Sequence, residues 1–450
     1  LREKFPKKME RVEGIAIATM RDTFVLLDED GEVVRPSLLW LDQRQAACEG
    51  KLPFKFDMGA KLVRMDKIIL AERKMSKLNW IKENEPKTWE RTHHLLMMSG
   101  YLNYKLTGLF VDSYASQIGH IPFDYKIREW AKEGSFLHAM FKVDKGRLPD
   151  LVAPGTVIGQ LTPQAMEALG FSHSVKVIAA GSDKGCETVG VGCVNPRSIS
   201  LSFGTAATIQ TAMKDYKELI PFMPSYTGVD PEKYNPEVQI YRGYWMISWF
   251  KKEFGTKDVL RAAEMGVLPE ELLNEHLDDV PPGAEGLILQ PFWKPEIRKP
   301  DARGAIVGFS DIHNRYHIYR AIIEGINYAL MEGLEKIEKA TKVKVKKIYV
   351  SGGGSNSDSI CQLTADMFNL PVVKGETIEA SGLGAAVAGF IGLGMYKNFD
   401  EAVKKMVREK TVYSPEARNA ALYHDLYHNA YKEIYPSLGK VYHHINRALE

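Results

Sequence analysis

The fold of this chain is indicated first by the stretch Val177-Ile178-Ala179-Ala180-Gly181-Ser182-Asp183-Lys184-Gly185. Its apolar, partly β-branched residues stop at Gly181, and a segment of small residues follows over 185–192. This pattern predicts a buried strand that ends in a tight turn before a helix. Asp183 then lies at the carboxyl end of the strand, which is where open α/β sheets bind ligands. We therefore expect an α/β fold with a ligand site at Asp183.

Two interpretations of Asp183 remain open from these residues alone. A carboxylate at the end of a strand can accept a proton from a substrate hydroxyl. An aspartate just before a helix is also a common N-cap, whose side chain bonds the first backbone N–H groups.

The composition is that of an ordinary globular protein. A length of 450 residues is typical of two or three domains. The 59 basic and 57 acidic side chains leave a net charge of +2, so no nucleic acid partner is expected. The four cysteines and twelve histidines show no spacing typical of a metal site. The cysteines are scattered and fit a reducing cytoplasm better than a disulfide framework, so we expect a cytoplasmic protein. The longest uncharged run, over 380–396, is too short to span a membrane.

The order strand, small polar turn and helix recurs further along the chain. A strand over Ser198–Phe203 runs into Gly204-Thr205, and a second over 347–350 runs into Gly352-Gly353-Gly354. Apolar spacing predicts a long helix over 316–341 and another over 358–369. Asn195-Pro196 breaks the chain between the first two units. We therefore expect domains over 1–195 and 196–450.

The beginning of the chain predicts a hairpin. Small and apolar residues alternate from Gly14 to Asp28, and Asp28-Glu29-Asp30-Gly31 is a strong turn signal. Residues 33–41 are the expected partner strand. Within this region Arg21-Asp22 interrupts the apolar pattern, which indicates either an ion pair or a strand end facing a cleft. Trp40 is either a core residue or an apolar wall for the carbon skeleton of a polyol.

The two glycine turns are candidate phosphate and nucleotide sites. Gly204-Thr205 offers backbone N–H groups and a hydroxyl to a phosphate, although such a dipeptide alone is usually only a turn. Three glycines between a strand and a helix favour a ligand that lies against bare backbone, and the helix N-terminus favours anions. Residues 381–388 predict a helix with one small, closely packed face.

Two longer segments resemble the signatures of a known family. Gly304-Ala305-Ile306-Val307-Gly308-Phe309, followed by His317-Ile318-Tyr319-Arg320-Ala321-Ile322-Ile323-Glu324, resembles the C-terminal signature of the FGGY family of carbohydrate kinases. Lys77-Leu78-Asn79-Trp80-Ile81 resembles the core of the N-terminal signature, and the resemblance covers nearly the whole chain. It implies the two-domain actin-like, hexokinase-like (ribonuclease H-like) ATPase fold, with ligands in the cleft between the domains.

The resemblance also implies a role for each candidate residue. Asp183 stands where the family has its catalytic base. The positions that correspond to phosphate and adenosine contacts are Gly204, Thr205, Gly352, Gly353 and Ser357. The positions that correspond to sugar or polyol contacts are Arg21, Asp22, Trp40 and Lys184.

The expected function is that of an ATP-dependent carbohydrate kinase, a phosphotransferase with an alcohol group as acceptor. It would use Mg²⁺ to transfer the γ-phosphoryl group to a sugar or polyol, in the manner of xylulose and glycerol kinases. The alternative is a non-catalytic sugar- or nucleotide-binding protein on the same fold, and a homodimer is left open.

Some positions depart from the family pattern. Arg21-Asp22-Thr23 resembles the Arg-Glu-Thr of glycerol kinases more than the Met-His of xylulose kinases. Lys184 stands where relatives often have Gln or Asn, and Glu72 stands where glycerol kinases have an aromatic residue. Phe309 stands where the family usually has an aliphatic residue. No Asp-x-Gly-Thr phosphate loop precedes Arg21, so we expect the hairpin that carries it to be missing from the front of this sequence.

Overall fold

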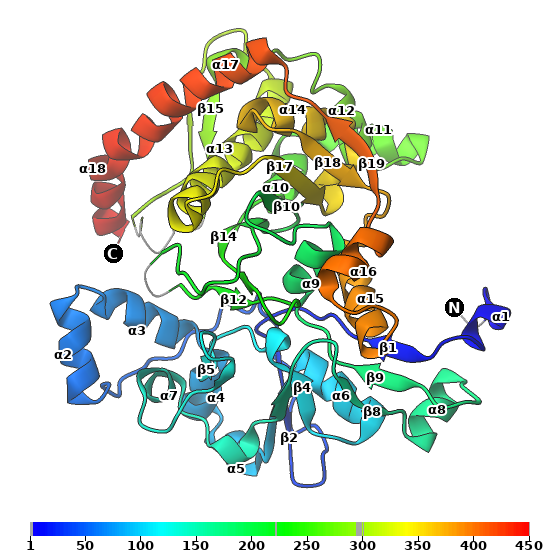
Figure 1. Ribbon diagram of the computed structural model, residues 1–450. Coiled ribbons are helices and arrows are strands. Elements are labelled where there is room, and N and C mark those ends of the chain that lie inside the picture. The colour runs from blue at the N-terminus through cyan, green and yellow to red at the C-terminus, as the bar shows by residue number, and fades with distance from the viewer. Residues whose placement is uncertain (1–2, 221–222, 294–298, 300, 450) are drawn as a thin grey trace.

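The computed structural model describes residues 3–220, 223–293, 299 and 301–449. Two α/β parts lie one above the other, with the earlier residues in the lower part of the view and the later ones above (Figure 1). We use "N-terminal part" for the described residues up to 195 and "C-terminal part" for those that follow. In the described residues, no helix is both long and apolar enough to cross a membrane.

A six-stranded sheet forms the centre of the C-terminal part. Its strands, in spatial order, are β14 (Glu237–Ile240), β11 (Ala207–Gln210), β10 (Ser198–Phe203), β17 (Lys347–Ser351), β18 (Val372–Gly375) and β19 (Glu409–Tyr413). β10, β17 and β18 run parallel, and the outer strands pair antiparallel. Because β10 and β17 are parallel neighbours, the turns at their carboxyl ends, Gly204 and Gly352, lie at one edge of the sheet.

The sequence of β10 explains its two faces. Ile199, Leu201 and Phe203 are at most 1% exposed and belong to the main apolar core. The serines alternate with them and point to the opposite face, because successive side chains of a strand alternate. The core side is covered by the long helix α13 (Arg315–Thr341) and by α14 (Asp358–Phe368). The predicted strands β10 and β17 and the predicted helices α13 and α14 are confirmed.

The remaining elements of the C-terminal part surround this sheet. They include β12 (Tyr226–Thr227), β13 (Tyr234–Asn235), α10 (Trp245–Glu253), α11 (Thr256–Met265), α12 (Pro269–Glu275), β15 (Ile288–Gln290), β16 (Ala305–Val307), α16 (Phe399–Met406), α17 (Ala417–Leu426) and α18 (Lys432–Leu449).

The N-terminal part holds a smaller sheet in the order β1 (Gly14–Ala16), β9 (Lys176–Ile178) and β8 (Val157–Gln160). β1 and β9 are parallel, and β9 leads into α9 (Asp183–Gly190). Around them lie α1 (Pro6–Met9), α2 (Phe54–Leu62), α3 (Asp66–Met75), α4 (Lys77–Asn84), α5 (Pro86–Arg91), α6 (Met98–Thr107), β4 (Val111–Ser113), β5 (Phe123–Asp124), β6 (Glu129–Trp130), α7 (Phe136–Phe141), β7 (Asp150–Val152) and α8 (Pro163–Leu169).

The hairpin predicted near the beginning of the chain is wrong in its partner. β2 (Phe24–Leu27) pairs antiparallel with β3 (His94–Met97), and residues 33–41 contribute only one isolated bridge, from Val33 to Leu27. All four residues of β2 are buried, so the strand needs an apolar neighbour. Leu95, Leu96 and Met97 provide it, whereas Leu39 and Leu41 in the expected partner are about half exposed.

A crossing of two helices joins the two parts. α9 packs against α15 (Ala380–Gly392), which follows β18 in sequence but lies beside α9 and β1 (Figure 1). A Cβ on Gly384 would fall on the carbonyl oxygen of Cys186, so only glycine allows this approach. The closely packed small face predicted for residues 381–388 is therefore confirmed, and it brings Ser381 to the beginning of α9.

Candidate active site

A cleft of about 780 Å³ opens between the two parts. Its lining includes most of the residues that the sequence singled out, namely Arg21, Asp22, Trp40, Asp183, Lys184, Gly204 and Thr205. These residues are spread over 185 positions of the chain, so the fold gathers them into one space. Gly352, Gly353 and Ser357 are not part of this lining.

Asp183 occupies the first turn of α9, at the carboxyl end of the β9 strand. The N-cap of this helix is Ser182, whose Oγ accepts a hydrogen bond from the Gly185 N–H at 3.2 Å. The N-cap interpretation of Asp183 is therefore wrong. Its side chain is 40% exposed, and Oδ1 accepts the backbone N–H of Lys184 at 2.8 Å. The carboxylate faces the cleft at a helix N-terminus, where the helix dipole favours negative charge.

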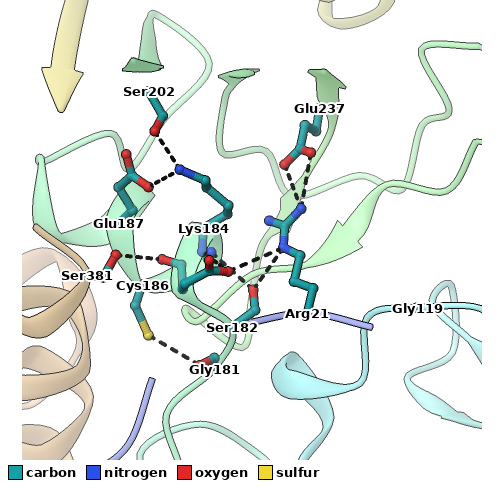
Figure 2. Close-up of polar contacts among 12 residues, drawn as sticks. Arg21, Gly119, Gly181, Ser182, Lys184, Cys186, Glu187, Ser202, Glu237 and Ser381 are labelled. Carbon is teal, nitrogen blue, oxygen red and sulfur yellow. Dashed lines mark hydrogen bonds and ion pairs between the residues drawn. The ribbon is translucent and has the colours of Figure 1, made fainter. Parts of the chain in front are cut away.

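Arg21 connects Asp183 to the C-terminal part. Its Nη1 donates to Oε1 and Oε2 of Glu237 on β14, at 3.1 and 2.9 Å (Figure 2). Its Nε lies 3.8 Å from Oδ1 of Asp183. The guanidinium also stacks on Tyr226, 4.9 Å from the ring centroid. The ion pair between Arg21 and Asp22, which was one of the two interpretations of the sequence, does not form.

One nitrogen of Arg21 is left over. Among the described residues, Nη2 is buried and has no hydrogen-bond partner. A buried guanidinium nitrogen without a partner is costly unless a ligand supplies an acceptor. Arg21 itself lines the cleft beside Asp183, which makes this nitrogen a candidate donor for a ligand.

Asp22 belongs to a group of charged side chains that local sequence patterns did not reveal. Its Oδ2 accepts from Lys77 Nζ at 2.9 Å and lies 3.1 Å from His120 Nδ1, while Oδ1 accepts the His120 backbone N–H at 3.0 Å. His120 Nε2 lies 3.3 Å from Oε2 of Glu72 on the other side. All four residues line the cleft, so Asp22 organises its wall.

The proximity of these charges changes two pKa values. Burial alone would lower the pKa of His120, but the carboxylates of Asp22 and Glu72 outweigh it and raise the pKa to about 10. Burial would raise the pKa of Asp22, but His120 and Lys77 outweigh it and lower the pKa to about 2. At neutral pH this wall of the cleft therefore carries alternating, mutually paired charges.

Lys184 is paired separately from the residues of the Asp22 wall. Its Nζ lies 2.7 Å from Oε2 of Glu187 and 2.5 Å from Oγ of Ser202, at the end of β10 (Figure 2). Figure 2 shows Arg21 and Lys184 extending from the same region toward different partners. Lys184 lines the cleft but directs its charge toward the turn at Gly204.

The two glycine turns meet at the edge of the central sheet. Gly352 has a φ of +79°, and a Cβ there would lie 2.9 Å from the backbone of Phe203, so a side chain cannot be accommodated. A Cβ on Gly353 would meet open space, which leaves its backbone accessible to a ligand. The Ser357 Oγ accepts from the Ile360 N–H at 3.3 Å and caps α14.

Trp40 lies at the exposed side of the cleft. It is 38% exposed, and its backbone N–H donates to the Thr23 hydroxyl at 3.3 Å, which fixes it beside the Arg21 segment. The indole is therefore available to a ligand and is not a core residue.

The donor groups fit a nucleotide with its metal. The turn at Gly204 and the bare backbone at Gly353 suit phosphate and nucleotide oxygens. In the described part of the chain, no group of three or more His, Cys, Asp or Glu side chains could hold a metal ion. Mg²⁺ bound with a nucleotide needs only one or two carboxylates, because phosphates and waters complete its shell. Asp183 is one carboxylate that lines the cleft.

The comparison with family models covers most of the chain. Residues 4–190 match the N-terminal domain, and residues 199–393 the C-terminal domain, of the FGGY family of carbohydrate kinases. The FGGY kinases use ATP as phosphate donor.

Individual relatives agree with this match. A xylulose kinase of Bacillus subtilis is 29% identical over 433 residues, which are 94% of this chain and 83% of that protein. The sugar kinase YgcE of Escherichia coli is 28% identical over 445 residues, 96% of this chain and 81% of that protein.

A solved structure shows the same fold. The ligand-bound xylulose kinase of Lactobacillus acidophilus superposes with a TM-score of 0.80 at 23% identity, covering 99% of this chain and 89% of that one. The two-domain actin-like ATPase fold expected from the sequence is thereby confirmed. The two family models, the relatives and the cleft between two α/β parts lead to one conclusion: this chain belongs to the FGGY family of carbohydrate kinases.

Proposed function

We propose that this kinase transfers the γ-phosphoryl group of ATP to a hydroxyl of a neutral sugar or polyol bound in the cleft. The observation that carries the proposal is that Asp183, the Arg21 guanidinium and the Gly204 turn line one cleft. A base, an acceptor-orienting cation and a phosphate turn are the parts that phosphoryl transfer to an alcohol requires.

Asp183 accepts the proton of the acceptor hydroxyl as the oxygen attacks phosphorus. Arg21 holds the acceptor through Nη2 and keeps the carboxylate oriented through the 3.8 Å contact of its Nε. Trp40 provides an apolar surface for the carbon skeleton, and Asp22 maintains the polar wall opposite. Positioning and electrostatic stabilisation then supply most of the rate enhancement.

ATP lies along the edge of the central sheet in this proposal. The Gly204-Thr205 turn donates to phosphate oxygens, the backbone at Gly352 and Gly353 carries the adenosine, and Ser357 holds the start of α14 behind it. Mg²⁺ neutralises the phosphate charge when it is bound. The two domains meet near residue 195, between the segments 4–190 and 199–393 that match the two family models.

The acceptor is expected among uncharged ketoses and polyols, with xylulose as the first to test. A relative of 29% identity is a xylulose kinase. The charged wall built on Asp22 and His120 is internally paired, so it offers hydrogen bonds without excess charge of either sign. This favours hydroxyl-rich neutral molecules over sugar acids.

The proposal is tested by a coupled ADP-release screen over ketoses, aldoses and polyols, followed by one substitution. Asp183→Asn should lower turnover on the best acceptor by about 10²–10⁴, the usual contribution of general-base assistance. ATP affinity should stay unchanged. Asp425→Asn is the control, since that exposed carboxylate bonds only Asn429 on its own helix surface among the contacts described.

Two outcomes would contradict the proposal. A wild-type protein that binds ATP but phosphorylates none of the acceptors would remove the function. An Asp183→Asn variant within a few-fold of wild-type turnover, under conditions where chemistry limits the rate, would remove Asp183 from the mechanism.

A further inference from the structure

The ammonium of Lys184 is held by two elements that carry the phosphate site. Glu187, one turn later on α9, accepts from Nζ at 2.7 Å, and the Ser202 hydroxyl lies 2.5 Å away. Ser202 is two residues before Gly204, on the serine face of β10 that is turned away from the core. The long side chain of Lys184 is therefore fixed at the entrance to the Gly204 turn.

Glu187 is a buried carboxylate whose partners explain this arrangement. It is 6% exposed, and besides Lys184 it accepts a hydrogen bond from the Ser351 hydroxyl at the end of β17. Burial opposes its ionisation, but Lys184 and the serine hydroxyls outweigh burial and lower the pKa of Glu187. One ionised carboxylate thus joins α9 to the ends of both strands, β10 and β17, that lead into the glycine turns.

A buried ion pair of this kind is weak evidence for stability alone. Removing two charges from water costs free energy that their attraction returns only in part, so an apolar pair would hold the elements together as well. What the pair does achieve is a fixed position for a positive charge. That charge stands at the edge of the sheet where the proposed function places the ATP phosphates.

The ammonium has a donor to spare for a ligand. Of its three N–H donors, Glu187 and Ser202 engage two among the described residues. The nitrogen also lies 4.0 Å from the position that a Cβ on Gly204 would take. Since Gly204 has no side chain, the third N–H is within reach of a phosphate oxygen bound at this turn.

We propose that Lys184 contacts the phosphoryl group that is transferred, with Glu187 as the residue that positions it, and that Lys184 does not contact the sugar. The identity of the ligand rests on the proposed function. In the transfer, the acceptor oxygen forms its bond to the γ-phosphorus while the bond from that phosphorus to the β–γ bridging oxygen breaks. The acceptor proton goes to Asp183. Lys184 keeps its proton and offers positive charge to the phosphoryl oxygens throughout.

The predicted effect is specific to phosphates. A hydrogen bond to a charged group contributes enough that its loss weakens binding by about ten- to a hundredfold. Lys184→Met should therefore lower ATP affinity about tenfold or more, measured by calorimetry without an acceptor. Adenosine affinity should not change. In the steady state, turnover should fall at least as much while the acceptor KM stays within about twofold.

Three further variants make the experiment selective. Glu187→Gln keeps the ammonium of Lys184 but removes the carboxylate that fixes its position, so it should lower turnover more than ATP affinity. Lys184→Arg keeps a positive charge, so its turnover and ATP affinity should both lie between those of Lys184→Met and wild type. Lys344→Met is the matched control, because Lys344 pairs with Glu338 at 2.6 Å on the exposed surface. If Lys184→Met fails to fold because Glu187 is left unpaired, the double variant Lys184→Met/Glu187→Gln carries the same prediction.

Each outcome decides between the two proposals. An unchanged ATP affinity and turnover in Lys184→Met, with a raised acceptor KM, would overturn this inference and make Lys184 a sugar contact. Wild-type protein that binds ATP but phosphorylates no acceptor would refute the proposed function alone, since the comparison of ATP with adenosine could still be made. A wild type that binds no ATP would overturn both.

Discussion

His120 should make the stability of this protein fall as the pH rises above neutral. Its imidazole lies between Asp22 and Glu72, and its pKa of about 10 in the folded chain compares with an ordinary value of 6.5. A group whose pKa is raised by folding stabilises the folded state fully below pH 6.5. That contribution disappears as the pH rises toward 10. Within this window His120 holds a proton in the folded chain that it has lost in the unfolded chain.

The size of the effect follows from that single proton. The His120 contribution to the unfolding free energy falls by about 1.4 kcal/mol per pH unit, or about 3 kcal/mol between pH 7 and pH 9. Burial lowers the pKa of Lys82 to about 7, which changes the stability in the opposite direction over the same range, so the difference in slope between wild type and variant measures His120. His120→Gln, which is neutral throughout, should lack this slope. Asp22 acts in the opposite direction, because folding lowers its pKa from 3.8 to about 2. Its contribution is present above pH 3.8 and is lost as the pH falls toward 2.

Urea unfolding at pH 6, 7, 8 and 9 measures the slope in wild type and variant. His444→Gln, a change at an exposed histidine, is the control and should keep the wild-type slope. NMR titration of the histidine ring protons gives the pKa of His120 directly, by the signal that is missing from His120→Gln. Equal slopes in wild type and His120→Gln, or a His120 signal that titrates below pH 7, would refute the reasoning.

Two further predictions use the glycines. Gly353→Trp should raise the KM for ATP more than the KM for the sugar in steady-state assays. It should not lower the melting temperature, because a Cβ on Gly353 enters open space, whereas a Cβ on Gly354 would strike Tyr244. Loss of sugar affinity with ATP affinity kept would reverse the assignment of the two sites. Gly384→Ala should lower the melting temperature sharply, because the new Cβ falls on the backbone of α9. Gly382→Ala on the same helix places its Cβ in open space and should stabilise the helix by up to about 1 kcal/mol. Equal melting temperatures for the two variants would contradict the close helix crossing.

Local patterns were enough to find the strand ends that face the cleft. Gly204 and Gly352 each follow a short strand directly, and Asp183 comes five residues after β9 ends. A strand that runs into a small polar turn is a signal contained in about ten residues. Such a signal needs no knowledge of distant parts of the chain. The roles of these residues in catalysis and nucleotide binding remain predictions until the variants are measured.

Partners that come from far along the chain had no local signal. Glu237 lies 216 positions after Arg21, and His120 lies 98 positions after Asp22, yet each forms the ion pair that determines how its partner is held. The sequence instead suggested that Arg21 and Asp22 pair with each other. The two residues lie in a bend, with Asp22 at a φ of +48°, and each side chain has its own distant partner.

The α/β class, the central strands β10 and β17, the helices α13 and α14, and the family could all be predicted from the sequence. These depend on hydrophobic periodicity and on turns, which are local, and on signature segments that can be compared directly. Only the tertiary structure decided that β2 pairs with β3, that Lys184 turns toward Glu187, and that α15 crosses α9. Each of these depends on which surfaces are buried together, and burial joins residues that chain order keeps apart.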